Sequence, residues 1–121
     1  MATELPRLRS CPPHELLARI GDKWTVMVLV ALSLAPDNRL RFSELKQSVV
    51  GISQRMLTST VRALERDGLL LRHYFAEVPP RVEYQLTARG QSILPFLSGL
   101  IGWIGETWPE IQQSRAEYDA R

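Results

Sequence analysis

The stretch GISQRMLTSTVRALERDGLL, residues 51–70, decides the fold because it describes one helix with clear ends. Ser53 is a favourable N-cap residue, whose side chain can accept a hydrogen bond from the first turn. Gly68 stands where a helix commonly ends in a left-handed conformation. At about 100° per residue, one side of this helix is apolar and consists of Leu57, Val61 and Leu64. This side is expected to pack in the core.

The opposite side of the same helix carries positive charge and hydroxyl groups. An arc of about 60° contains Arg55, Ser59, Arg62 and Arg66, flanked by Gln54 and Thr58. For the helix alone, an ordinary solvated surface is the better explanation. The alternative interpretation, a surface that contacts phosphates and bases, is favoured only if the flanking sequence supports it.

The sequence before this helix predicts further helices. Apolar spacing and turn residues indicate helices over residues 13–20, 24–35 and 43–48, the last capped by Ser43. The second of these is apolar around nearly its whole circumference, so it is expected in the middle of the domain. LRF, residues 40–42, is consistent with a short strand.

The sequence after Gly68 changes from helical to alternating periodicity. LLLRHYF, residues 69–75, is dense in strand-forming residues. VEYQLT, residues 82–87, alternates, and its apolar side consists of Val82, Tyr84 and Leu86. AEVPPR, residues 76–81, joins the two strands as a turn stiffened by prolines, with Arg81 at its base. A two-stranded hairpin with a basic edge is therefore predicted.

Helices followed by such a hairpin predict a winged helix-turn-helix, in a chain that is mainly α with a small β-hairpin (α+β). Residues 43–48 are expected to cross the backbone of a DNA duplex, and the helix after Ser53 to enter the major groove with its N-terminal half. In this context the cationic side of that helix is predicted to contact DNA. Arg55 and Arg62 suit guanine, whereas Thr58 and Ser59 suit a phosphate or a thymine methyl group.

Three motifs also resemble a known family. CPPHELLARIGDKWTVMVL (residues 11–29), RFSELKQSVVGISQRMLTSTVRALERDGLLLR (41–72) and EVPPRVEYQLTARG (77–90) are similar to the signature of HxlR-type regulators, relatives of the MarR winged-helix group. The motifs occur in the order and at the spacing of that family, and the similarity covers residues 11–103. The resemblance implies one domain over residues 1–121, with a C-terminal helical dimerisation tract over residues 88–121.

Members of that family are homodimeric bacterial transcription factors without enzymatic activity, and the resemblance implies the same here. It also implies dimerisation helices at both ends of the chain. By resemblance, the DNA-reading helix presents Ser53, Gln54, Arg55, Thr58, Ser59 and Arg62. The hairpin is then the wing, and Arg81 is its DNA-contacting residue.

The C-terminal tract repeats apolar residues at helical spacing, which indicates a long amphipathic helix. The residues predicted to form a dimer interface are Leu97, Leu100, Ile101, Ile104 and Trp108. The stripe packs either on its own domain or across a two-fold axis. It is longer than one small core can cover, and paired half-sites require two reading heads, so dimerisation is favoured. Pro95 is expected to kink or delay this helix, and Pro109 to begin a separate last segment.

Cys11 is the only cysteine and stands at the start of the first predicted helix. The positive end of a helix dipole lowers the pKa of a thiol, and Arg7 and Arg9 would act in the same direction. The residue is therefore either a sensor of oxidants or a small buried apolar side chain. The alternative signal is a small-molecule effector, bound among apolar residues between the domain and the dimer helices.

Several function classes are excluded by composition. One cysteine allows no intrachain disulfide and no multi-cysteine zinc site, and no cofactor motif is present. Cys11 and His14 lie near each other without a third orienting residue or an oxyanion-hole motif, so no enzyme is predicted. No stretch reaches the roughly 20 apolar residues of a membrane span, so a cytoplasmic protein is expected, and the resemblance implies a bacterial one that is associated with the nucleoid.

The predicted function is a homodimeric transcriptional regulator, bound to a pseudo-palindromic operator in double-stranded DNA, and the resemblance to HxlR-type regulators implies that it is a repressor. Of the 15 basic residues, 13 are arginines, the side chain best suited to bidentate contacts with phosphate and guanine. The alternative is a winged helix used only for contacts with other proteins. Steep salt dependence of duplex binding distinguishes the two.

Overall fold

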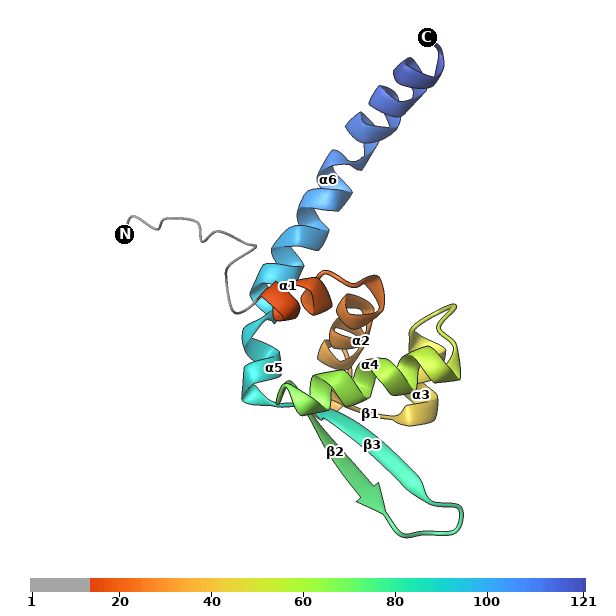
Figure 1. Cartoon of the computed structure of the whole chain (residues 1–121), viewed down its shortest axis with the longest axis vertical. Helices are drawn as coiled ribbons and strands as arrows, with labels where there is room; N and C mark the ends of the chain where they lie inside the picture. The colour runs from red at the N-terminus through yellow and green to blue at the C-terminus, as the bar shows by residue number, and fades with distance from the viewer. Residues whose placement is uncertain (1–13) are drawn as a thin grey trace, which may run out of the picture.

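The computed structural model describes residues 14–121, which form a small helical domain with a projecting hairpin and a projecting helix (Figure 1). The elements follow in the order α1 (His14–Ile20), α2 (Lys23–Ser33), a 3-10 turn (Pro36–Asn38), β1 (Arg39–Arg41), α3 (Phe42–Ser48), α4 (Gln54–Arg66), β2 (Leu70–Phe75), β3 (Arg81–Leu86), α5 (Ala88–Ser92) and α6 (Leu94–Asp119). The hairpin of β2 and β3 leaves the domain at one end, and α6 leaves it at the opposite end.

A three-stranded antiparallel sheet in the order β1-β3-β2 forms the root of the hairpin. Leu70 lies opposite Leu86 and Phe75 opposite Arg81 in the β2–β3 pair. Tyr84 and Leu86 are buried, as the alternating sequence of this strand predicts. The winged helix-turn-helix expected from the sequence is thus confirmed, and the sheet gains a third strand from β1.

The core lies between α2, α3, α4 and the sheet. Its fully buried side chains are Leu29, Leu32, Leu45, Leu57, Leu64, Val28, Val49 and Val61. The apolar side of α4 therefore packs inward as predicted. Helix α2 contacts α1, α3, α4, α6 and the sheet, which confirms its central position.

Helix α4 begins and ends at the residues that the sequence indicates. The Ser53 hydroxyl accepts a hydrogen bond from the backbone N–H of Met56, at 3.0 Å. Gly68 has a φ of 77°, the left-handed conformation that stops the helix at little cost for glycine. Because both ends are fixed, the residues between them have a defined rotation about the helix axis.

The start of α3 differs from the expectation. The helix begins at Phe42, and the Glu44 carboxylate accepts the backbone N–H of Arg41, at 2.8 Å. Ser43 therefore lies inside the first turn and does not cap the helix. The backbone N–H that precedes the helix is instead satisfied by an acidic side chain, the Glu44 carboxylate in the first turn.

Glycine is required where α5 meets the sheet. A Cβ atom at Gly90 would lie 2.2 Å from the backbone oxygen of Leu69, a distance that no side chain tolerates. Helix α5 is therefore held directly against the backbone that leads into β2.

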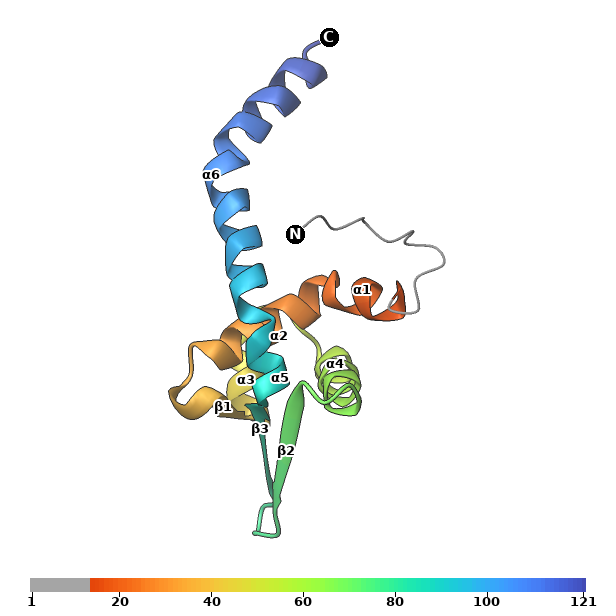
Figure 2. The ribbon, with the colours of Figure 1, turned by 90° about the vertical axis from the view of Figure 1, so that its left-hand side faces the viewer.

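The C-terminal helical tract has one break, at Ile93, between α5 and α6. Pro95 lies in the first turn of α6, where its missing N–H costs nothing, so the predicted delay of the helix is confirmed. The expectation for Pro109 is wrong, because α6 continues through it to Asp119. The axis of α6 bends about midway instead (Figure 2), as expected where a proline removes one backbone hydrogen bond.

Candidate nucleic-acid interface

Helix α4 presents five of the predicted DNA-contacting residues around one shallow hollow. Its lining consists of Gln54, Arg55, Thr58, Ser59 and Arg62. Thr58 is half-buried, and the other four are exposed. We call this set the α4 surface. Because α4 is fixed at Ser53 and Gly68, these side chains share one direction.

Within residues 14–121, no acidic side chain neutralises the charges of the two arginines of the α4 surface. Among residues 14–121, neither Arg55 nor Arg62 forms an ion pair with an acidic side chain. A guanidinium group presents five N–H donors in a planar fork, which matches a phosphate or the major-groove edge of guanine. Ser53, the sixth predicted residue of this helix, uses its hydroxyl oxygen to cap α4.

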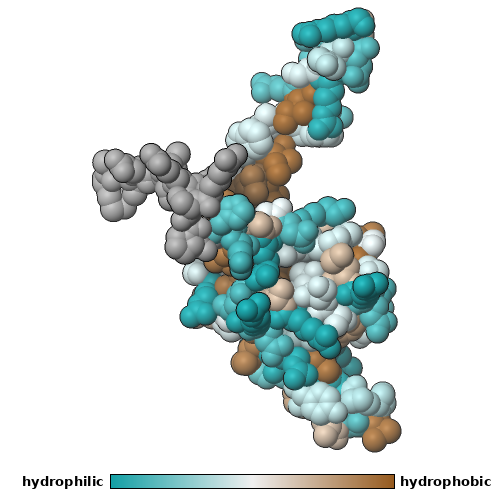
Figure 3. All heavy atoms as spheres, viewed as in Figure 1, coloured by the Kyte–Doolittle hydropathy of each residue, from teal (hydrophilic) through white to brown (hydrophobic). Residues whose placement is uncertain are grey.

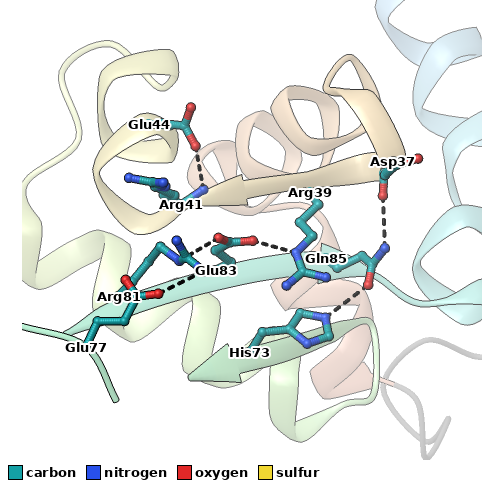
Figure 4. A network of polar contacts seen from close by, with 9 residues as sticks. All are labelled: Asp37, Arg39, Arg41, Glu44, His73, Glu77, Arg81, Glu83 and Gln85. Atoms are coloured by element: carbon teal, nitrogen blue, oxygen red, sulfur yellow. Dashed lines mark hydrogen bonds and ion pairs between the residues drawn. The ribbon is translucent and has the colours of Figure 1, made fainter. Parts of the chain in front are cut away.

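Arg81, the predicted wing residue, is held inside an ion-pair network and stands where β3 leaves the turn of the wing, opposite Phe75 (Figure 4). Its side chain is 27% exposed and pairs with Glu83, Nε to Oε2 at 2.9 Å, and with Glu77, Nη2 to Oε1 at 3.3 Å. The guanidinium carbon also lies 4.1 Å from the ring centroid of Phe75. The structure thus places Arg81 on the wing, with its charge already balanced by two carboxylates.

Glu83 is the centre of this network. Its Oε1 accepts a hydrogen bond from Arg39 Nε at 2.6 Å, and its Oε2 faces Arg81. The hydrogen bond from Arg39 lowers the pKa of Glu83, burial works against this, and the charges of Arg39, Arg81 and Arg41 lower the pKa further. The carboxylate is therefore ionised at neutral pH and joins β1 to β3.

A second hydrogen-bonded chain lies beside the first. The side-chain oxygen of Gln85 is 3.0 Å from His73 Nε2, and its amide nitrogen donates to the backbone oxygen of Asp37 at 3.1 Å (Figure 4). These contacts connect both strands of the wing to the turn before β1. The wing is thus a rigid extension of the domain at its root.

A larger hollow separates α4 from the wing. It has a volume of about 760 Å³, and four of the residues that line it are arginines: Arg41, Arg62, Arg72 and Arg81. We call it the wing hollow. Sequence reasoning did not select Arg41 or Arg72. Arg41 is brought to this hollow by the pairing of β1 with β3, which places it opposite Glu83, and the sequence carries no signal for that register.

Helix α6 carries the predicted dimer residues, and they separate into two groups. Leu97 is 4% exposed and belongs to the core of its own chain, so it lies away from any surface that a partner could reach. The other four are large exposed apolar side chains: Leu100, Ile101, Ile104 and Trp108. We call these four the α6 apolar face. Figure 3 shows hydrophobic residues gathered on α6 where it leaves the domain.

The remaining predictions for sites have the following positions. Cys11, the predicted thiol sensor, lies outside residues 14–121. Within that range, no cluster of three histidine, cysteine or acidic side chains suits a metal ion. No helix in the same range is both long and apolar enough to cross a membrane.

The fold and the basic helix define a winged helix-turn-helix protein. The chain matches the model of the HxlR-like helix-turn-helix family over residues 19–112. An HTH-type transcriptional regulator of Methanothermobacter thermautotrophicus is 43% identical over 107 residues, which are 88% of this chain and 79% of the relative. The solved structure of the transcriptional regulator YtfH from Salmonella typhimurium has a TM-score of 0.80 at 37% identity, covering 89% of this chain and 94% of that one. The redox regulator HypR in its reduced form has a TM-score of 0.73 at 32% identity, covering 85% and 99%.

The chain therefore belongs to the HxlR-like helix-turn-helix family. Membership confirms the resemblance seen in the three sequence motifs. These findings support a DNA-binding transcriptional regulator over a winged helix used only for contacts with other proteins.

Proposed function

We propose that the protein is a homodimeric repressor that reads a pseudo-palindromic operator with the α4 surface. The observation that carries this proposal is the α4 surface itself, on which both arginines are exposed and unpaired within residues 14–121. Arginine on a rigid helix is the commonest means of reading guanine in the major groove.

The residues of the α4 surface differ in which groups of the DNA they can contact. Arg55 and Arg62 donate two parallel hydrogen bonds to O6 and N7 of a guanine, and Gln54 suits the N6 and N7 of an adenine. Thr58 and Ser59 donate a hydroxyl to a phosphate or pack on a thymine methyl group. Ser53 caps the helix and thereby sets the depth and direction of these side chains.

The dimer is formed through the α6 apolar face. Leu100, Ile101, Ile104 and Trp108 are between 40% and 49% exposed, and Phe96 and Trp103 add further exposed apolar surface. Such a surface loses contact with water when a second α6 packs on it. To read successive major grooves on one face of a duplex, such a two-fold dimer has to present its two copies of α4 about 34 Å apart.

The signal that releases the operator is either oxidation of Cys11 or binding of a small molecule. Two solved relatives, HypR and YodB, are a redox regulator and a transcriptional regulator whose structures were determined in reduced, oxidised or diamide-treated forms. Their similarity supports the thiol as the first signal to test. The protein has no catalytic role in this proposal, and it works in the cytoplasm, where the chromosome lies.

The decisive experiment is duplex binding as a function of salt. Labelled duplexes are first selected from a random pool by the purified protein, and their affinity is then measured by fluorescence anisotropy between 50 and 200 mM KCl. Phosphate contacts predict a linear fall of log K with log salt, by about 0.9 for each phosphate neutralised. Absence of any salt-dependent duplex affinity would reject the proposal and favour a protein-binding winged helix.

A further inference from the structure

The wing hollow holds more positive than negative charge. Two acidic residues, Glu65 and Glu77, face its four arginines. The excess charge makes the hollow attractive to an anion. Its arginines differ, however, in how much of their charge is already balanced by neighbours.

Two of these arginines are committed to carboxylates. Arg81 pairs with Glu77 and Glu83 and lies against Phe75. Arg72 lies 3.6 Å from Glu65, as a looser and more exposed pair. A DNA phosphate that approached Arg81 would compete with two carboxylates for the same guanidinium group, so this residue has little remaining attraction to offer.

Arg41 has the opposite properties. Its side chain is exposed, and within residues 14–121 it forms no ion pair. Its backbone is fixed twice, because its N–H donates to the Glu44 carboxylate and β1 pairs it with Glu83 of β3. Glu83 itself is occupied by Arg39 and Arg81. Arg41 (Figure 4) is thus a cation without an ion-pair partner among residues 14–121, on a backbone fixed at two points. It lines the wing hollow, which separates α4 from the wing.

We infer that Arg41 binds a phosphate of the DNA strand that passes the wing hollow, and that Arg81 is a positioning residue that holds the wing. The inference rests on the proposed function, because it supposes that α4 lies in the major groove. Ser43 lines the same hollow and supplies a hydroxyl donor to the same phosphate. The contact carries no sequence information, because phosphates are the same at every base pair.

The test compares Arg41→Gln with Arg41→Lys, and uses Arg121→Gln as the control. Arg121 ends the chain beyond α6, so its loss removes the same charge far from the wing hollow. Two labelled duplexes of 30 base pairs are used, one of random sequence and one selected by the protein. Arg41→Gln should reduce the magnitude of the salt slope by about 0.9 on both duplexes, so that its affinity deficit shrinks about 3-fold between 50 and 200 mM salt. Arg41→Lys should keep the slope, since it keeps the charge.

Arg81→Gln provides the second readout. If Arg81 is a positioning residue, Arg81→Gln should have the same salt slope as the wild type. Its melting temperature should be lower, because Glu83 loses a partner. A slope for Arg41→Gln equal to that of the wild type, or a loss of slope in Arg81→Gln alone, would overturn the inference. In either case the proposed function stands as long as the wild type binds duplex. A wild type that binds neither duplex overturns both.

Discussion

The guanidinium group of Arg19, in α1, forms an ion pair with the carboxylate of Asp67, the residue that directly follows α4. The backbone oxygen of Asp67 also accepts a hydrogen bond from Arg89 of α5, at 3.0 Å. A carboxylate at the C-terminal end of a helix faces the negative end of the helix dipole, and Arg19 offsets this repulsion. The C-terminal end of α4 is thus tied to α1 and α5.

Loss of this tie should affect both stability and DNA binding. Arg19→Ala should lower the free energy of unfolding by about 0.5–1 kcal/mol, the range of a partly exposed pair. Operator affinity should fall, while the salt slope stays unchanged because no phosphate contact is lost. Urea unfolding of Arg19→Ala, Asp67→Ala and the double variant gives the coupling energy. Strict additivity of the two single effects would mean that the pair contributes nothing.

The arginines of the α4 surface should differ from Arg41 in sequence dependence. Arg55→Ala and Arg62→Ala are each expected to cost about 1–3 kcal/mol on the selected operator if they read guanine. The loss should be smaller on duplexes in which the contacted base pair is changed, and a set of single-base-pair operator variants measures this. A uniform loss across all variants would assign the side chain to a phosphate.

Two leucines on α6 provide a matched comparison. Leu100→Glu should yield folded monomers, because it places a charge in the α6 apolar face, and sedimentation velocity checks this. Leu97→Ala should instead lower stability by about 2–5 kcal/mol with the dimer retained, because Leu97 fills the core of its own chain. A dimer that survives Leu100→Glu would move the interface elsewhere.

Glu83 should give the fold an acid-sensitive contribution. Its pKa is lowered in the folded protein, so the stabilisation is complete above the unfolded value near 4.5 and is lost as the pH falls through the folded value. Glu83→Gln should therefore be less stable than the wild type at pH 7, and the difference should shrink below pH 4.5. Thermal melts of both proteins between pH 3 and pH 7 measure this. A difference that is independent of pH would show that the charge of Glu83 is not what stabilises the wing.

The proposed role of Cys11 as a thiol sensor can be tested without knowing its position in the structure. Diamide titration of the reduced protein should weaken operator binding, and Cys11→Ser should bind normally and ignore diamide. Mass spectrometry confirms that the thiol has been oxidised. Unchanged affinity with the oxidised thiol would end the sensor hypothesis and leave the small-molecule effector.

Local chemistry explains what could be predicted from the sequence. Ser53 and Gly68 act on neighbouring residues, so the ends of α4 follow from the sequence alone. The alternation around Tyr84 depends only on the period of a strand, so the wing follows as well. The exposed face of α4 then follows from the helical period between two fixed ends.

The remaining features depend on residues that are distant in the sequence. Glu83, which pairs with the nearby Arg81, is also bound by Arg39 of β1, 44 residues away, and the sequence gives no register for β1. Leu97 belongs to the same periodic stripe as Leu100, and only the direction of α6 relative to α2 shows which of the two is buried. The sequence also does not show that α6 continues through Pro109 to Asp119, with an axis that bends about midway (Figure 2).

The close contact at Gly90 has a consequence for how the two halves of the molecule are related. Even one added methyl group would collide with the peptide that leads into the wing, so α5 has no freedom to slide along the sheet. Because α6 starts almost immediately after α5, the direction in which α6 leaves the domain is set by the same contact with the Leu69 peptide. In the dimer that we propose, the angle between the two DNA-bound copies would therefore depend on a position where the chain has no side chain at all.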